Sequence, residues 1–111
     1  MTCNITGEYS GLAPTALITF DFHDSATIRN AEEIVNTILR RVDSRHVTIH
    51  KNMYLGETIR RSSISSDTHG NRLIVVLNYE VEGITAQGSK LVEQDVNKIV
   101  RLIEAALSGI V

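Results

Sequence analysis

The hydrophobic residues of this chain change their spacing along its length, and this change limits the folds that it can adopt. They recur at every second residue over 15–22 and 72–82, which is the period of a half-buried strand. They recur every three to four residues over 25–42 and 89–107, which is the period of an amphipathic helix. Weaker alternation predicts three further strands, over 3–9, 46–54 and 57–65.

The order of these segments is strand, strand, helix, three strands, helix. It predicts an α+β fold, a two-layer sandwich in which two helices cover one face of an antiparallel or mixed sheet. We expect four to five strands in that sheet, and one domain over residues 1–111, because two separate cores would each bury too little apolar surface.

Polar residues mark the ends of the predicted elements. Asp24 or Ser25 can accept hydrogen bonds at the start of the first helix. The polar stretch 66–71 predicts the turn of a hairpin. Ile59 and Ile64 fall on opposite faces of a regular strand, so both reach the core only if a bulge separates them.

Composition and charge exclude several classes of protein. The formal net charge is −2, so no overall basic field would hold a polyanion, although residues 29–72 carry eight of the eleven Lys and Arg residues. The single cysteine, Cys3, and the lack of a signal-peptide pattern predict a cytoplasmic protein. No apolar run approaches the length of a membrane span, so we expect a soluble chain and no membrane partner. No motif points to a cofactor.

The face of the sheet opposite the helices must meet water or a partner. The residues predicted there form a mixed surface with an aliphatic centre: Leu17, Thr48, His50, Ile74, Val76 and Asn78. We expect this chain to form a homo-oligomer, a dimer, by packing sheet against sheet or by pairing edge strands. The alternative is that scattered aliphatic side chains on an exposed sheet are an ordinary part of a protein surface.

Two further groups of residues suggest chemistry, and each has a structural alternative. Asp21 and His23 lie at the carboxyl end of a predicted central strand and could reach one metal ion, but the stronger interpretation is a solvated carboxylate and a turn residue. Five basic residues could bind the phosphates of a nucleic acid: Arg45, Lys51, Arg60, Arg61 and Arg72. Tyr54 is the only aromatic residue near them, and a solvated strand edge explains the same charges. His46 and His50 lie about 13 Å apart on a strand and cannot share one ion there.

The strings ITFDFHDS and HKNMYLGE resemble small ferredoxin-like nucleases of the CRISPR-associated and VapD type, over about a third of the chain. The resemblance implies a metal-dependent nuclease in which Asp21 is the metal-binding acid. The chain departs from it after Gly56, where a hairpin replaces the second crossover helix.

No nucleophile motif or phosphate-binding loop occurs, so enzyme activity has no positive support. The sequence therefore predicts a non-enzymatic interaction or regulatory module that self-associates through its sheet, with another protein as a further partner. A metal-dependent nuclease or nucleic-acid-binding protein is the alternative. A third class, a small-molecule sensor between sheet and helices, leaves no sequence signature.

Overall fold

The computed structural model describes residues 1–42, 47–83 and 87–109. It has the predicted order of elements and is an α+β fold. The elements are β1 (Thr2–Glu8), β2 (Thr15–Asp21), α1 (Ser25–Val42), β3 (Val47–Asn52), β4 (Glu57–His69), β5 (Arg72–Glu82) and α2 (Gly88–Leu107).

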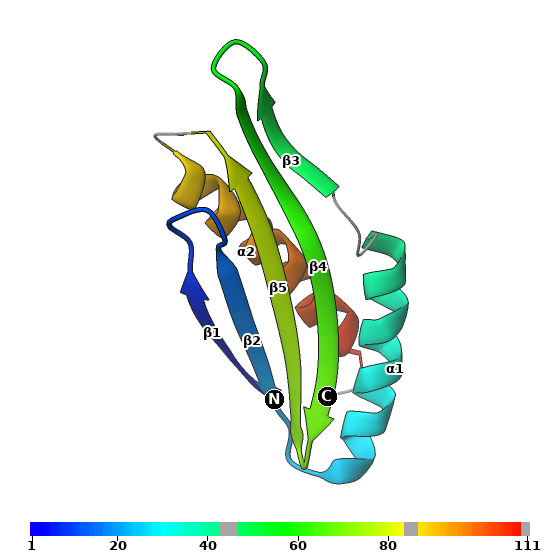
Figure 1. Cartoon of the computed structure of the whole chain (residues 1–111). Coiled ribbons are helices and arrows are strands. Elements are labelled where there is room, and N and C mark those ends of the chain that lie inside the picture. Colours follow the sequence, from blue (N-terminus) through cyan, green and yellow to red (C-terminus); the bar gives the residue numbers. More distant parts are fainter. Residues whose placement is uncertain (43–46, 84–86, 110–111) are drawn as a thin grey trace.

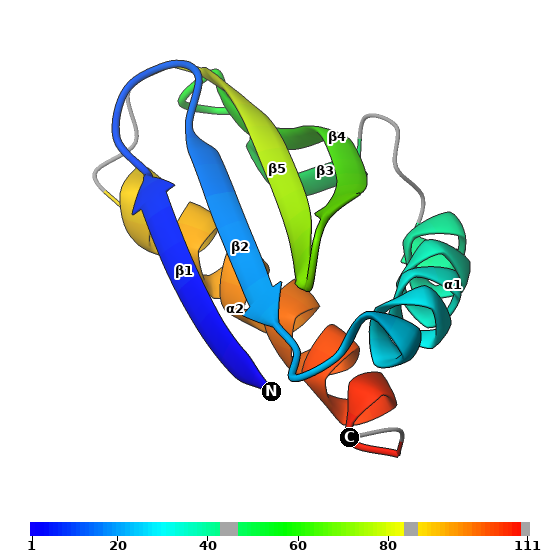
Figure 2. The same ribbon diagram turned by 90° about the horizontal axis from the view of Figure 1, so that it is seen from below.

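The five strands form one sheet in the order β1-β2-β5-β4-β3, and every neighbouring pair is antiparallel. Both helices lie on the same side of this sheet (Figure 1). Viewed from below, α2 runs beneath the sheet and α1 lies beside it, next to β4 (Figure 2). Within the described residues, no helix or strand covers the opposite face of the sheet.

The core fills the space between the sheet and the helices. In β2 and β5, alternate residues are buried, and paired residues such as Ile18 and Val75 point to the same side of the sheet. In α2, the buried residues recur with helical spacing: Val92, Val96, Ile99, Val100, Ile103 and Leu107. The two periods seen in the sequence thus give the two inner surfaces of one core.

The first helix begins where the sequence predicts. The Asp24 carboxylate accepts hydrogen bonds from the backbone N–H and the hydroxyl of Thr27, at 2.7 and 2.8 Å. These hydrogen bonds to Thr27 lower the pKa of Asp24, because they stabilise its ionised form. Asp24 is therefore the N-cap of α1, which leaves its carboxylate occupied by the helix start.

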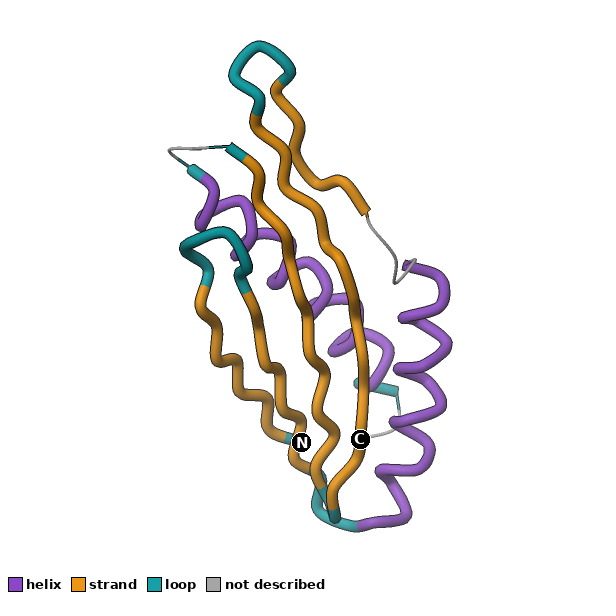
Figure 3. The backbone as a smooth tube through the Cα atoms, viewed as in Figure 1, coloured by secondary structure: helices purple, strands orange, loops and turns teal. Residues whose placement is uncertain are grey.

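The prediction of a long polar turn over 66–71 is wrong. Ser66, Asp67, Thr68 and His69 continue β4 and pair with β5, so the connection is only Gly70-Asn71, closed by the pair of His69 and Arg72. Gly70 has a φ of 61°, which suits a glycine in a two-residue hairpin. Both strands continue almost to the tip of the hairpin (Figure 3). Pairing with β5 outweighs the turn preference of this polar composition.

A bulge in β4 brings its two isoleucines to one side. The register with β5 shifts between Arg61 and Ser63, and both Ile59 and Ile64 are buried against the helices. This confirms the prediction that both isoleucines reach the core if a bulge separates them.

A second bulge lies in β3, and it changes the side to which His50 points. The register with β4 shifts between Thr48 and His50, so His50 pairs with the buried Ile59 and lies on the helix side. The prediction that His50 lies on the uncovered face is therefore wrong. The strand predicted over 46–54 ends at Asn52, so Met53 is 80% exposed in the turn that follows.

Candidate interaction surface

The face of the sheet that no helix covers has an aliphatic centre on its two middle strands, β2 and β5. Leu17 pairs with Val76, and Thr19 pairs with Ile74, so these side chains lie next to one another. Leu17 is 41% exposed, and Ile74 and Val76 are half-buried. We call Leu17, Ile74 and Val76 the open-face patch. It offers apolar surface to a partner without being part of the core.

Two ion pairs lie on this face, one on either side of the patch. At one end, Arg72 Nε lies 2.7 Å from Asp21 Oδ1. At the other end, Arg60 Nη1 lies 3.1 Å from Glu82 Oε1. Both pairs are at least partly exposed and contribute little to folding. Asp67, opposite Ile74, and Glu80, opposite Arg60, also lie on this face, so it carries further acidic side chains beside these two pairs.

Of the residues predicted for the interface, all except His50 lie on the uncovered face of the sheet. Leu17, Ile74, Val76 and Asn78 lie together on β2 and β5, and Asn78 donates a hydrogen bond to Ser63 at 2.9 Å. Thr48 lies on the same face, but on β3, where it pairs with Arg60 and is separated from β5 by β4. Thr48 is therefore outside the open-face patch. His50 Nε2 instead lies 3.3 Å from Glu57 Oε2 on the helix side.

The five cations predicted for nucleic acid do not form one cluster. Arg61 is only 5% exposed and points toward α2, because it pairs with Tyr79 on the helix side of the sheet. Arg60 and Arg72 are in the two ion pairs described above and lie roughly 27 Å apart along β5. Lys51 is exposed on β3, and Arg45 lies outside the described residues. The described cations of this set therefore do not form a continuous basic surface.

Asp21 and His23, the two residues predicted to bind a metal, lie in different surroundings. The Asp21 carboxylate binds Arg72, with a second contact of 3.5 Å from Arg72 Nη2 to Asp21 Oδ2. His23 is exposed beyond the end of β2. Within residues 1–42, 47–83 and 87–109, no three His, Cys, Asp or Glu side chains are grouped so that they could hold a metal ion. His46 lies outside the described residues.

A buried polar cluster lies between β4, β5 and α2, and it was not predicted from the sequence. The Tyr79 hydroxyl donates a hydrogen bond of 2.6 Å to Asp95 Oδ2, and Arg61 Nε lies 3.1 Å from the same oxygen. The side chains of Arg61 and Asp95 are only 6% and 9% exposed. Burial and the hydrogen bond to Asp95 raise the pKa of Tyr79. The sequence signal was the alternation of Glu57, Ile59 and Arg61, which places Arg61 on the core side.

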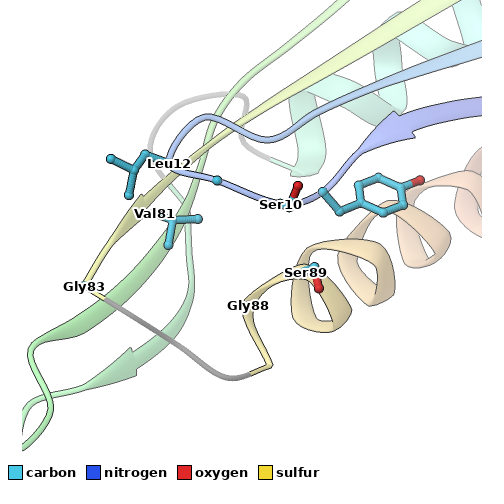
Figure 4. A pocket seen from close by; sticks show the side chains of 8 residues that line it. Ser10, Leu12, Val81, Gly83, Gly88 and Ser89 are labelled. Atoms are coloured by element: carbon cyan, nitrogen blue, oxygen red, sulfur yellow. The ribbon is translucent and has the colours of Figure 1, made fainter.

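Three open hollows lie at the margins of the fold, with volumes of about 260, 420 and 370 Å³. Figure 4 shows the first, between the β1–β2 loop, the end of β5 and the start of α2. Ser10 and Ser89 supply hydroxyls there, Leu12 and Val81 supply apolar surface, and no charged side chain lines it. Among the described residues that line it, none is a base that could activate a hydroxyl.

The open-face patch is an apolar surface that neither described helix covers. Neither described helix is long and apolar enough to cross a membrane. Comparison of the chain with protein-family models, with curated proteins and with solved structures finds no match.

Proposed function

We propose that this protein is a small non-enzymatic interaction module that self-associates as a dimer, with the open-face patch as the contact. The observation that carries the proposal is the position of three neighbouring aliphatic side chains on the one face of the sheet that no helix covers. Burying one aliphatic side chain fully contributes roughly 1.5–3 kcal/mol. Leu17, Ile74 and Val76 are already partly buried in the single chain, so each contributes only part of this amount to a contact.

A second copy suits this surface because a two-fold contact brings each patch against itself. Such a contact requires a surface that is apolar at its centre and does not repel its own copy. The open-face patch is aliphatic, and the ion pairs Asp21–Arg72 and Arg60–Glu82 lie at its two ends. The task that we infer for such a module is regulatory binding of another protein in the cytoplasm.

Mutation of the patch tests self-association. We expect the double variant Ile74→Lys/Val76→Lys to convert the dimer to a monomer, because it would place four ammonium groups in one apolar contact. Leu17→Lys should raise the dimer dissociation constant by about tenfold or more, which corresponds to about 1.4 kcal/mol or more. Leu17 is partly exposed already, so this variant keeps the fold. The measurement is molar mass by light scattering over a range of concentrations.

The matched control is Asn30→Lys, which adds the same charge on an exposed position of α1, on the helix side of the molecule. It should leave the mass unchanged. Circular dichroism of each variant reports whether the fold is kept. A wild-type protein that is monomeric at all concentrations, or a mass that Leu17→Lys and Ile74→Lys/Val76→Lys leave unchanged, would overturn the proposal.

A thermal-shift experiment separates this function from the alternative of a metal-dependent nuclease or nucleic-acid binder. A ligand that binds only the folded protein raises its melting temperature in proportion to the logarithm of its concentration. We expect no shift with Mg²⁺ or Mn²⁺, or with short single-stranded RNA or DNA, because the described cations are paired, buried or scattered. A rise that grows with ligand concentration would favour the alternative and count against an interaction module alone.

A further inference from the structure

The two edges of the sheet differ in how well they are protected against pairing with another strand. The edge strand β3 contains a bulge between Thr48 and His50 and an exposed Lys51, and α2 packs against it. A bulge and an edge lysine are features with which proteins prevent edge pairing. The other edge strand, β1, pairs with β2 over all seven residues without a register shift.

β1 lacks the features that protect β3. Its sequence, TCNITGE, contains no Pro, Lys or Arg, and its one charge, Glu8, is at its end. Six of its seven residues are exposed, and Ile5 is 40% exposed although it pairs with the fully buried Ile18. β1 lies along the margin of the sheet (Figure 2). Among the described residues, no strand pairs with its outer side.

From this difference we propose that β1 pairs antiparallel with β1 of a second copy, with the two-fold axis at Ile5, so that two sheets join into one. This register brings Ile5 against Ile5 of the second copy, on the helix side of the joined sheet. It brings Asn4 against Thr6, and Thr2 against Glu8. The two Glu8 carboxylates lie roughly 20 Å apart at opposite ends of the pairing.

The second copy is the occupant because the strand is complementary to itself in this register. An apolar side chain meets its equivalent, polar side chains meet polar ones, and no charge faces a like charge. The joined β1 strands would satisfy backbone groups that the edge otherwise leaves to water. This contact goes beyond the proposed function, because it uses the edge of the sheet and leaves the open-face patch uncovered.

Disulfide formation tests the register. In a Cys3→Ser background, Ile5→Cys should give a covalent dimer rapidly under mild oxidation, because directly opposed Cα atoms lie about 4.5–5.5 Å apart, within disulfide range. The matched control Thr2→Cys should not, since the two Thr2 positions lie roughly 20 Å apart. The readout is the fraction of dimer on a non-reducing gel. Equal cross-linking of both variants indicates random collision and would overturn the register.

Charge placement tests the same pairing without a covalent bond. Ile5→Lys would oppose two ammonium groups, so we expect the edge contact to weaken by about tenfold or more. Thr2→Lys adds the same charge on the same strand but would face Glu8 of the second copy, so it should keep or strengthen the contact. Equal effects of the two variants, or a protein that neither cross-links nor associates, would overturn the proposal.

The two proposals fail separately. Ile5 and Leu17 point to opposite sides of the sheet, because Ile5 pairs with Ile18. Efficient cross-linking of Ile5→Cys with an unchanged mass of Leu17→Lys would retain the edge pairing and remove the open-face contact. Loss of association in Leu17→Lys without cross-linking of Ile5→Cys would give the reverse conclusion.

Discussion

Replacing Asp95 with leucine should destabilise the fold by about 3–5 kcal/mol, because Arg61 would keep its charge in the core without a counter-ion. Arg61 is 5% exposed, and its Nε lies 3.1 Å from Asp95 Oδ2. The Tyr79 hydroxyl would also lose its acceptor. Since small domains are stable by only about 5–15 kcal/mol, this change removes a large share of the total. Urea unfolding followed by circular dichroism measures it.

The double variant Arg61→Met/Asp95→Leu is the control for charge burial. It replaces both charges with apolar side chains, so it should recover most of the stability lost in Asp95→Leu. The exposed pair of Asp21 and Arg72 offers a comparison, because Asp21→Leu should change stability little when water solvates the remaining arginine. If Asp95→Leu unfolds in urea like the wild type, then Arg61 is not held by Asp95 in the way described.

The second large effect is a loss of stability at high pH that depends on Tyr79. The pKa of Tyr79 is raised above the ordinary value of 10.0 by burial and by the hydrogen bond to Asp95. Above pH 10 the unfolded chain releases the phenolic proton while the folded protein keeps it, so the unfolded state is favoured. Stability contributed by this group is therefore present below pH 10 and falls by about 1.4 kcal/mol for each further pH unit.

Tyr79→Phe isolates this effect. At neutral pH the variant should be less stable by about 1 kcal/mol, because the hydrogen bond to Asp95 is lost. Near pH 11 the two proteins should be equally stable, and above it the variant should be the more stable one. Burial also raises the pKa of Cys3 and Tyr9, but both proteins retain those groups. Parallel curves of stability against pH between 9 and 11.5 would contradict the assignment.

Much of the candidate surface could be predicted because it depends on the two-residue period of β2 and β5. Leu17, Ile74 and Val76 alternate with buried neighbours, so any regular strand must present them on the side away from the core. The helices were predictable for the same kind of reason, since Asp24 marks the start of α1 and the apolar stripe of α2 is continuous.

His50 could not be placed in this way, because it lies next to a bulge, and the alternation that puts Arg61 on the core side does not identify its partner. The extra residue in β3 turns His50 toward Glu57, and the pairing of β4 with β5 carries Arg61 to the Asp95 carboxylate. A bulge depends on the fit between two strands and leaves little signal in either alone. The polar run 66–69 became strand for a related reason, since its hydrogen bonds go to β5.

By itself, the sequence determined the order of strands and helices and the side of β2 and β5 that meets the core. These properties follow from spacing within one segment, which local geometry converts directly into a face. Only the tertiary structure decided which strands are edges, where the two bulges lie and which charges are buried together. These properties depend on contacts between segments far apart in the chain, such as Tyr79 with Asp95 and Arg61 with α2, and no local pattern specifies them.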